Sequence, residues 1–224
     1  VEEGGYLLFS DVPGNVVFSW REGEGHRRWL EPSGYTGESP RGGEPGSNGL
    51  LVDPEGRLLL CQHGDRRLAR LDAPLARPQP RFATVADRWR GRRFNSPNDL
   101  ALHSSGALYF TDPPYGLEAG PGDPAREIDF SGIFRVDPGG RVTLLSDELS
   151  RPNGIAFSPD ERTLYVANSD PERAVWMAWD VEPDGDVANG RVFFDATDLG
   201  MPFPVELVSF NMHFDFDEAL PSIG

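Results

Sequence analysis

A pattern that repeats about every fifty residues constrains the fold of this chain more than any other feature. Three segments begin with Asn, continue as a short apolar run, pass through a polar turn and end in a second apolar run; they start at Asn48, Asn98 and Asn153. Fifty residues separate the first two starts and 55 separate the second and third. Strand–turn–strand units at this spacing are typical of β-propeller blades. A β-sandwich also has regularly spaced strands, but it gives no reason for an Asn at the start of each unit.

The composition narrows the function classes. No apolar run approaches the roughly 18 residues needed to span a bilayer, so a membrane protein is not expected. Asp and Glu number 36 against 21 Lys and Arg, for a net charge of −15, which disfavours nucleic-acid binding. All the basic residues are Arg, which excludes Schiff-base lysine chemistry, and the single Cys61 excludes an internal disulfide. The residues 81–90 are the best candidate for a helix.

The repeated Asn has two interpretations. The first strand of a propeller blade borders the central channel, so three Asn in register would bring amide oxygens together on the axis, where a hard cation such as Ca²⁺ binds oxygen ligands. Alternatively, each Asn closes an Asx turn or adopts a left-handed conformation before its strand. Because the three are in register, we expect the first interpretation to hold for at least two of them.

Five stretches carry a family resemblance: Gly5-Tyr6-Leu7-Leu8-Phe9-Ser10-Asp11-Val12-Pro13-Gly14-Asn15, Cys61-Gln62-His63-Gly64, Asn95-Ser96-Pro97-Asn98-Asp99, Phe110-Thr111-Asp112-Pro113-Pro114-Tyr115-Gly116 and Arg151-Pro152-Asn153-Gly154-Ile155-Ala156-Phe157-Ser158-Pro159-Asp160. With them the chain resembles the gluconolactonase/regucalcin (senescence marker protein) family, most closely its bacterial gluconolactonase-like branch. The resemblance implies an all-β fold, the six-bladed β-propeller. At about 50 residues a blade, the chain covers four to five blades and the ring is not expected to close. We expect an incomplete propeller over residues 1–202 and a divergent C-terminal tail over residues 203–224.

The resemblance also implies a site. The family holds one divalent metal ion on the propeller axis, for which Ca²⁺ is the first expectation and Zn²⁺ and Mn²⁺ are alternatives. Asn153 matches a direct metal ligand, and Asn98 matches an Asn that lies at or beside the metal and contacts the substrate. His63 and Tyr115 match positions near the mouth of the pocket. Glu127 is a weaker candidate for contact with a substrate hydroxyl.

Two departures from the family leave the catalytic base unassigned. The family's metal-binding Glu corresponds to a position before Val1, and Phe203 stands where the family has an Asp that is both ligand and base. We expect the tail to be the product of an incomplete or disrupted gene; the alternative is a genuine tail in which Glu206, Asp215 or Asp217 supplies the ligand.

The resulting functional expectation is a metal-dependent hydrolase that opens a sugar lactone. The metal would polarise the carbonyl for base-assisted attack by water. The sequence has no Gly-x-Ser-x-Gly elbow, so a serine hydrolase of that type is not expected. The alternatives are a propeller fragment or calcium-binding scaffold without turnover, and an enzyme of the strictosidine synthase or paraoxonase type. We expect a cytoplasmic protein, although a sequence that begins at Val1 leaves the periplasm and secretion open. The oligomeric state is not predicted.

Overall fold

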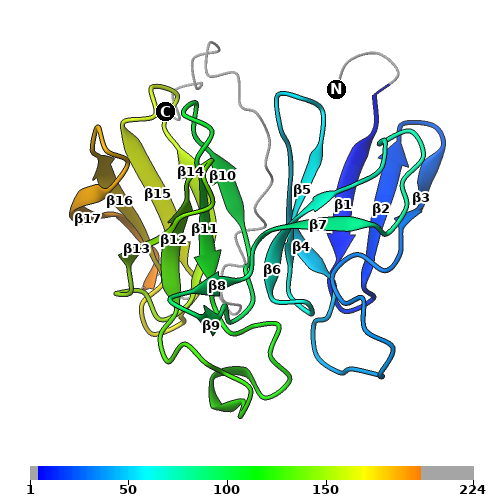
Figure 1. The fold of residues 1–224 in the computed structure, drawn as a ribbon. Coiled ribbons are helices and arrows are strands. Elements are labelled where there is room, and N and C mark those ends of the chain that lie inside the picture. The colour runs from blue at the N-terminus through cyan, green and yellow to red at the C-terminus, as the bar shows by residue number, and fades with distance from the viewer. Residues whose placement is uncertain (1–4, 198–224) are drawn as a thin grey trace.

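The computed structural model describes residues 5–197 of the chain, and these fold into four large antiparallel β-sheets placed side by side, together with a two-stranded ribbon (Figure 1). Within these residues helical conformation is limited to the 3-10 turn Gly120–Gly122 and to Thr197, so no helix there could span a membrane. The all-β propeller architecture expected from the repeats is confirmed. Residues 203–224, including Phe203 and the alternative ligands Glu206, Asp215 and Asp217, lie outside the described residues.

Each sheet is a meander in which successive strands are neighbours. The strands of the four sheets, which we call blades 1 to 4, are as follows: blade 1, β1 (Leu7–Asp11), β2 (Val16–Arg21) and β3 (Gly25–Leu30); blade 2, β4 (Ser47–Val52), β5 (Leu58–Gln62), β6 (Arg67–Leu71) and β7 (Phe82–Ala86); blade 3, β10 (Leu100–Leu102), β11 (Leu108–Asp112), β12 (Gly132–Val136) and β13 (Val142–Ser146); blade 4, β14 (Pro152–Phe157), β15 (Thr163–Asn168), β16 (Val175–Val181) and β17 (Val187–Asp195). The repeated segments are thus the first two strands of blades 2, 3 and 4.

Turn chemistry explains why the repeats form hairpins. Gly56 and Gly106 occupy the turns of the first two repeats with φ of 74° and 83°, a left-handed conformation that glycine adopts without steric cost. In the third repeat, which has one extra turn residue, Glu161 takes this conformation with φ of 56°. The Glu161 carboxylate accepts a hydrogen bond from the Ser104 backbone N–H (2.9 Å), so the longer turn also ties blade 4 to blade 3.

The hydrophobic core lies in the seams between neighbouring blades. One cluster fills the seam between blades 2 and 3, where the rings of Phe94, Phe110 and Phe134 pack with centroids 5.0–5.6 Å apart. A second cluster joins blades 3 and 4 and a third joins blades 1 and 2. Cys61 is fully buried in the first seam, as expected for a small apolar residue, and its burial raises the pKa of its thiol.

The helix expected over residues 81–90 is wrong. This segment forms β7, which pairs with β6 from Phe82 opposite Leu71 to Ala86 opposite Leu68, and then the strand β8 (Arg88–Trp89). β8 pairs with β9 (Arg92–Arg93) to make a small separate ribbon. The segment therefore pairs with β6, whose residues lie more than ten positions earlier in the chain. This pairing with a distant strand outweighs the weak local preference for a helix.

The inner strands of the blades bring the three repeat starts together. β10 lies beside β14 (Figure 1), and it also contacts β4. β4 in turn contacts β1, and β14 contacts β11. The four blades are thus arranged in succession around a common axis. The Asn of each repeat comes at the same end of its inner strand, so the fold places all three at one end of this axis.

Candidate functional site

The three repeated Asn side chains form a continuous hydrogen-bonded row. The Nδ2 of Asn48 donates to the Oδ1 of Asn98 at 2.7 Å, and the Nδ2 of Asn98 donates to the Oδ1 of Asn153 at 2.7 Å. The Nδ2 of Asn153 donates to the Oγ of Ser169 at 3.0 Å. Asn98, in the middle, is buried, whereas Asn48 and Asn153 are half-buried. The three Asn side chains therefore meet, in a row in which the Oδ1 atoms of Asn98 and Asn153 each accept a hydrogen bond from the neighbouring amide.

Close backbone approach makes this row possible. The backbone N–H of Gly49 donates to the Asn98 carbonyl at 2.7 Å, and a Cβ at position 49 would lie 2.8 Å from the Cα of Asp99. The Asp99 side chain points to the other neighbour, where its Oδ2 accepts a hydrogen bond from the Ile155 N–H at 3.0 Å. Asp99 thus joins blade 3 to blade 4 directly beside Asn98.

A buried carboxyl group fixes the segment that precedes Asn98. Asp112 accepts hydrogen bonds from the backbone N–H groups of Asn95 (2.7 Å) and Ser96 (2.8 Å), and it is fully buried. Burial raises the pKa of Asp112 to about 7, against the opposing effect of these two hydrogen bonds. This residue positions the Asn98 segment from within the protein.

The structure places His63 against the row. Its side chain is fully buried, and burial lowers the pKa of the imidazole to about 4. The Asn98 side chain and the Glu44 backbone favour the charged ring, while Arg41 disfavours it. Among the described residues neither ring nitrogen has a partner with hydrogen-bond geometry. His63 is therefore a neutral, buried ring that interacts with the Asn98 side chain and the Glu44 backbone.

Tyr115 lies at the other end of the row. Its hydroxyl donates to the Arg151 carbonyl at 3.3 Å. Hydrogen bonds with the side chains of Ser169 and Asn153 favour a lower pKa of this hydroxyl. Burial nevertheless raises the pKa of Tyr115 to about 12, so the phenol is protonated at neutral pH. The structure thus brings Asn98, Asn153, His63 and Tyr115 into one group.

Glu127 is placed differently. It is exposed, and its carboxylate accepts a hydrogen bond from the backbone N–H of Arg93 at 2.8 Å, on the ribbon of β8 and β9. Its contacts therefore tie two peripheral segments together, and no described contact joins it to the Asn row.

Sequence reasoning missed a carboxylate that does lie in this group. The Oε2 of Glu44 is 3.6 Å from the Nδ1 of His63, and the Glu44 charge contributes to the raised pKa of Tyr115. Glu44 belongs to the loop of residues 31–46 between β3 and β4, and the part of it from Gly37 to Gly46 is rich in Gly, Pro and charge, a composition that predicts an exposed loop. The sequence contains no signal that this loop folds back onto His63.

The donor chemistry of the row suits part of a divalent-cation site. Hard cations such as Ca²⁺ take amide oxygens as ligands, and rotation of an Asn amide exchanges its oxygen and nitrogen. In residues 5–197 no three His, Cys, Asp or Glu side chains gather closely enough to hold a metal ion. The described residues thus fit the neutral side of such a site, without the carboxylates that usually complete it.

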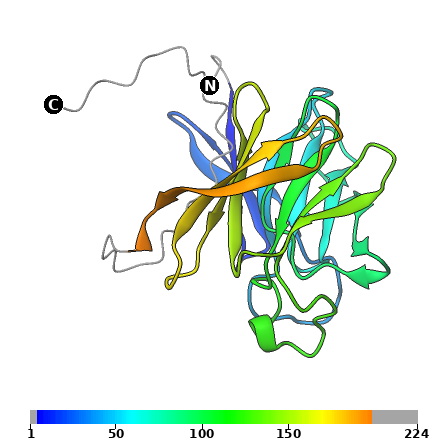
Figure 2. The ribbon, with the colours of Figure 1, turned by 90° about the vertical axis from the view of Figure 1, so that its left-hand side faces the viewer.

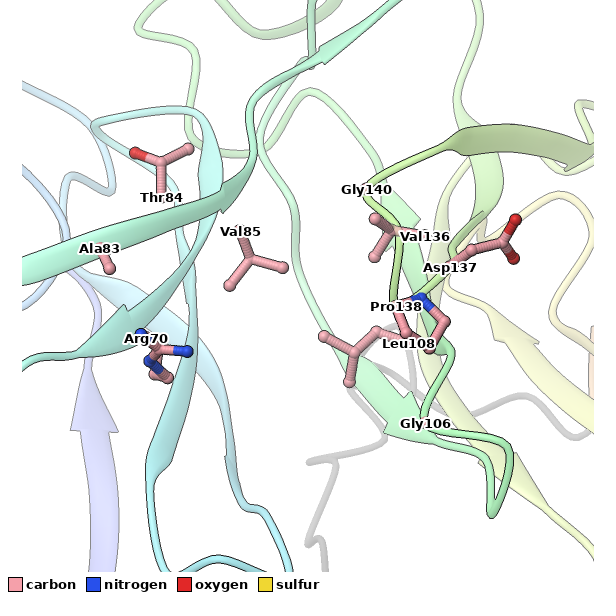
Figure 3. A pocket seen from close by; sticks show the side chains of 10 residues that line it. All are labelled: Arg70, Ala83, Thr84, Val85, Gly106, Leu108, Val136, Asp137, Pro138 and Gly140. Atoms are coloured by element: carbon pink, nitrogen blue, oxygen red, sulfur yellow. The ribbon is translucent and has the colours of Figure 1, made fainter.

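The cavity drawn in Figure 3 lies elsewhere. It has a volume of about 260 Å³ and opens between blades 2 and 3, where Arg70 and Val85 face Leu108 and Pro138. It borders the turns that follow β10 and β12, at the opposite end of the strands from Asn98. It is therefore separate from the Asn row.

Comparison with known proteins identifies the family. The model described as the SMP-30/gluconolactonase/LRE-like region matches residues 1–202. The chain belongs to this family. A gluconolactonase of Zymomonas mobilis is 46% identical over 172 residues, which cover 76% of this chain and 47% of that protein. The chain thus spans about half the length of this relative.

Solved structures agree with this assignment to the SMP-30/gluconolactonase family. The gluconolactonase XC5397 of Xanthomonas campestris superimposes with a TM-score of 0.68 at 33% identity, covering 84% of this chain and 58% of that one. Regucalcin of Agrobacterium tumefaciens, a calcium-binding protein, gives a TM-score of 0.57 at 21% identity, covering 88% of this chain and 57% of that one, which supports the fold alone.

Proposed function

We propose that this chain carries the substrate-binding and part of the metal-binding machinery of a lactone hydrolase that opens a sugar lactone. The observation that supports it most directly is the hydrogen-bonded row of Asn48, Asn98 and Asn153, inside a chain 46% identical to a gluconolactonase. Relatives of this kind act on cyclic esters, and the row places three amide groups side by side.

In this proposal Asn153 and Asn98 hold a divalent metal ion, with Ca²⁺ as the first candidate and Zn²⁺ or Mn²⁺ as alternatives. When bound, the ion supplies a Lewis acid that polarises the lactone carbonyl. Asn98 is ordered for this role because Asp112 holds the segment before it and the Gly49 N–H holds its carbonyl. The neutral amides leave the charge of the ion largely uncompensated, which favours the developing oxyanion.

His63 and Tyr115 lie beside the Asn row, His63 next to Asn98 and Tyr115 next to Asn153. Both are uncharged at neutral pH, since burial lowers the pKa of His63 to about 4 and raises that of Tyr115 to about 12. We propose that they bind and orient the substrate with neutral hydrogen bonds. Glu127 has a different place in the structure, and we propose no substrate contact for it.

The test measures acid release from glucono-δ-lactone above the spontaneous background, first in EDTA and then with Ca²⁺, Zn²⁺ or Mn²⁺ restored. We expect metal-dependent turnover that falls by about a hundredfold or more in Asn153→Ala. Calorimetry with Ca²⁺ should show weaker binding to Asn153→Ala and tighter binding to Asn153→Asp, because affinity follows ligand charge. Asn189→Ala, on the outer strand β17, is the control. Turnover that is unaffected by EDTA would contradict the proposal.

The second candidate function is a cation-binding scaffold without turnover. The observation in its favour is the Asn row itself, because amide oxygens can ligate a hard cation without taking part in hydrolysis. It predicts calorimetric Ca²⁺ binding that Asn153→Ala weakens, together with no hydrolysis of any lactone with or without metal.

A further inference from the structure

The cavity between blades 2 and 3 has an arginine on its blade 2 side (Figure 3). Arg70 pairs with Leu59 of β5 and with Ala83 of β7, so the three side chains share one face of blade 2. Leu59 is buried in the core cluster that joins blades 2 and 3. The Arg70 side chain is therefore on the face of blade 2 that is turned towards blade 3.

Much of the remaining wall of this cavity is apolar. Leu108 of β11 and Val136 of β12 belong to the core cluster of the seam, and Val85 of β7 packs against that cluster. The ring of Pro138, in the turn after β12, borders the same space. The carbon atoms of a ligand in the cavity would contact these side chains and lose their contact with water, which favours binding of an apolar group.

The charge of Arg70 is not paired with any acidic group in residues 5–197. Its guanidinium forms no ion pair or hydrogen bond with these residues. Asp137 also lines the cavity, but its Oδ1 lies 3.0 Å from the Nε of Arg135 and its Oδ2 lies 2.9 Å from the Nε of Arg141. Figure 3 shows the Asp137 carboxylate pointing away from Arg70. The cavity thus combines an unpaired positive charge with an apolar wall.

These features define the chemistry and the size of a matching ligand. The planar guanidinium of an arginine binds a carboxylate through two parallel hydrogen bonds. The volume of about 260 Å³ is several times the roughly 30 Å³ that one water occupies in the liquid, and lies just below the roughly 300 Å³ at which pockets for drug-sized ligands begin. A carboxylate on a short hydrocarbon chain matches the charge, the apolar wall and the space together.

We propose that the cavity between blades 2 and 3 is a binding site for a short-chain monocarboxylate. The carboxylate of the ligand accepts hydrogen bonds from Arg70, and its alkyl chain lies against Val85, Leu108 and Val136. Because such a ligand contacts both blades, its binding stabilises the folded chain. The site is separate from the Asn row, and the inference does not depend on the proposed lactone hydrolysis.

The test measures the Kd of three probes by NMR titration in EDTA: hexanoate, acetate, which has the charge without the chain, and hexanamide, which has the chain without the charge. Arg70→Gln removes the positive group, and Ala83→Leu fills the cavity beside it. Arg77→Gln is the matched control, since Arg77 is exposed in the loop between β6 and β7 and does not line the cavity. Asn153→Ala tests whether the probes bind at the Asn row instead, and thermal unfolding checks that each variant is folded.

We expect hexanoate to bind the parent chain about tenfold or more tightly than acetate, because its methylene groups leave water, and than hexanamide, because the charge-assisted hydrogen bonds are lost. Arg70→Gln and Ala83→Leu should each raise the Kd of hexanoate by about tenfold or more, whereas Arg77→Gln and Asn153→Ala should change it by less than about twofold. Saturating hexanoate should raise the Tm of the parent chain and leave that of Arg70→Gln unchanged.

Three results would overturn the inference. The first is that hexanoate does not bind measurably, or binds no more tightly than acetate. The second is that hexanoate binding survives both Arg70→Gln and Ala83→Leu. The third is that Asn153→Ala abolishes the binding while Arg70→Gln leaves it intact, which would assign the carboxylate to the Asn row. If Arg70→Gln does not fold, Ala83→Leu decides between the same outcomes.

Discussion

At the scale of single residues, the Asp112 carboxyl group holds the segment that leads to Asn98. It accepts the two backbone N–H groups of Asn95 and Ser96, and no solvent reaches it. Its pKa of about 7 in the folded chain lies well above the reference value of 3.8. Between these two values the folded chain holds a proton that the unfolded chain has released. The contribution of Asp112 to stability therefore falls as pH rises through this interval and is constant below it.

We predict that Asp112→Asn removes this pH dependence. The change should cost about 1–3 kcal/mol, because the amide cannot accept from both N–H groups and one buried donor loses its partner. Urea unfolding of the parent chain and the variant at pH 4.5, 6 and 7.5 gives the free energy of unfolding. The parent chain should lose more stability than the variant between pH 4.5 and 7.5. Equal losses in the two proteins would show that Asp112 does not titrate in this range.

At the scale of the elements, the contacts between blades determine the site. Gly49 and Asp99 are the points where blade 2 meets blade 3 and blade 3 meets blade 4, and Asn98 lies between them. A side chain at position 49 would come within 2.7 Å of the Asp99 carboxylate and 3.0 Å of the Asn98 carbonyl. The seam therefore requires glycine at this position for space alone.

We predict that Gly49→Ala destabilises the fold by about 1–3 kcal/mol, the usual cost of overpacking a close contact. The same substitution at Gly139 is the control, because that glycine is exposed and a Cβ there meets no atom within 4 Å. Thermal unfolding measures both. Separation of the blades should also weaken Ca²⁺ binding in Gly49→Ala. A variant as stable as Gly139→Ala would contradict the close packing of this seam.

At the scale of the whole molecule, the two end blades carry exposed apolar side chains. On blade 1 these are Leu7, Phe9 and Trp20, and on β17 of blade 4 they are Val192, Phe193 and Phe194 (Figure 2 shows β17, in orange, on the outside of blade 4). Leu7 pairs with Trp20 and Phe9 with Phe18 across β1 and β2, so the blade 1 residues share one face. Exposed apolar groups on this scale favour association.

We predict that this chain self-associates through these end faces. Phe9→Ser and Phe193→Ser, singly and together, should lower dye binding in an ANS fluorescence assay and shift sedimentation velocity towards a smaller species. Val52→Ser is the control, since Val52 is 51% exposed but belongs to neither end face. The high negative charge of −15 opposes association, so the effect should grow with added salt. Sedimentation that depends on none of these substitutions would contradict the prediction.

The sequence alone determined the repeat, the paired strands and the family. Strand alternation and turn glycines act between near neighbours, so the hairpins that follow Asn48, Asn98 and Asn153 can be read directly. The same repetition predicts that these Asn lie at equivalent places in successive blades, which the structure confirms. Recognition of the motifs around Asn98 and Asn153 then pointed to the family that the comparisons identify.

Beyond the three repeated Asn, only the tertiary structure decided which side chains meet. Most of the segment 81–90 forms the strand β7 because it pairs with β6. The Glu127 carboxylate accepts a hydrogen bond from Arg93 in the ribbon of β8 and β9 and not from the Asn row. Glu44 reached His63 through a loop whose sequence has no period and whose anchors, Gly64 and Gly116, lie far along the chain. Contacts of this kind depend on packing between distant segments, and local sequence patterns carry no information about it.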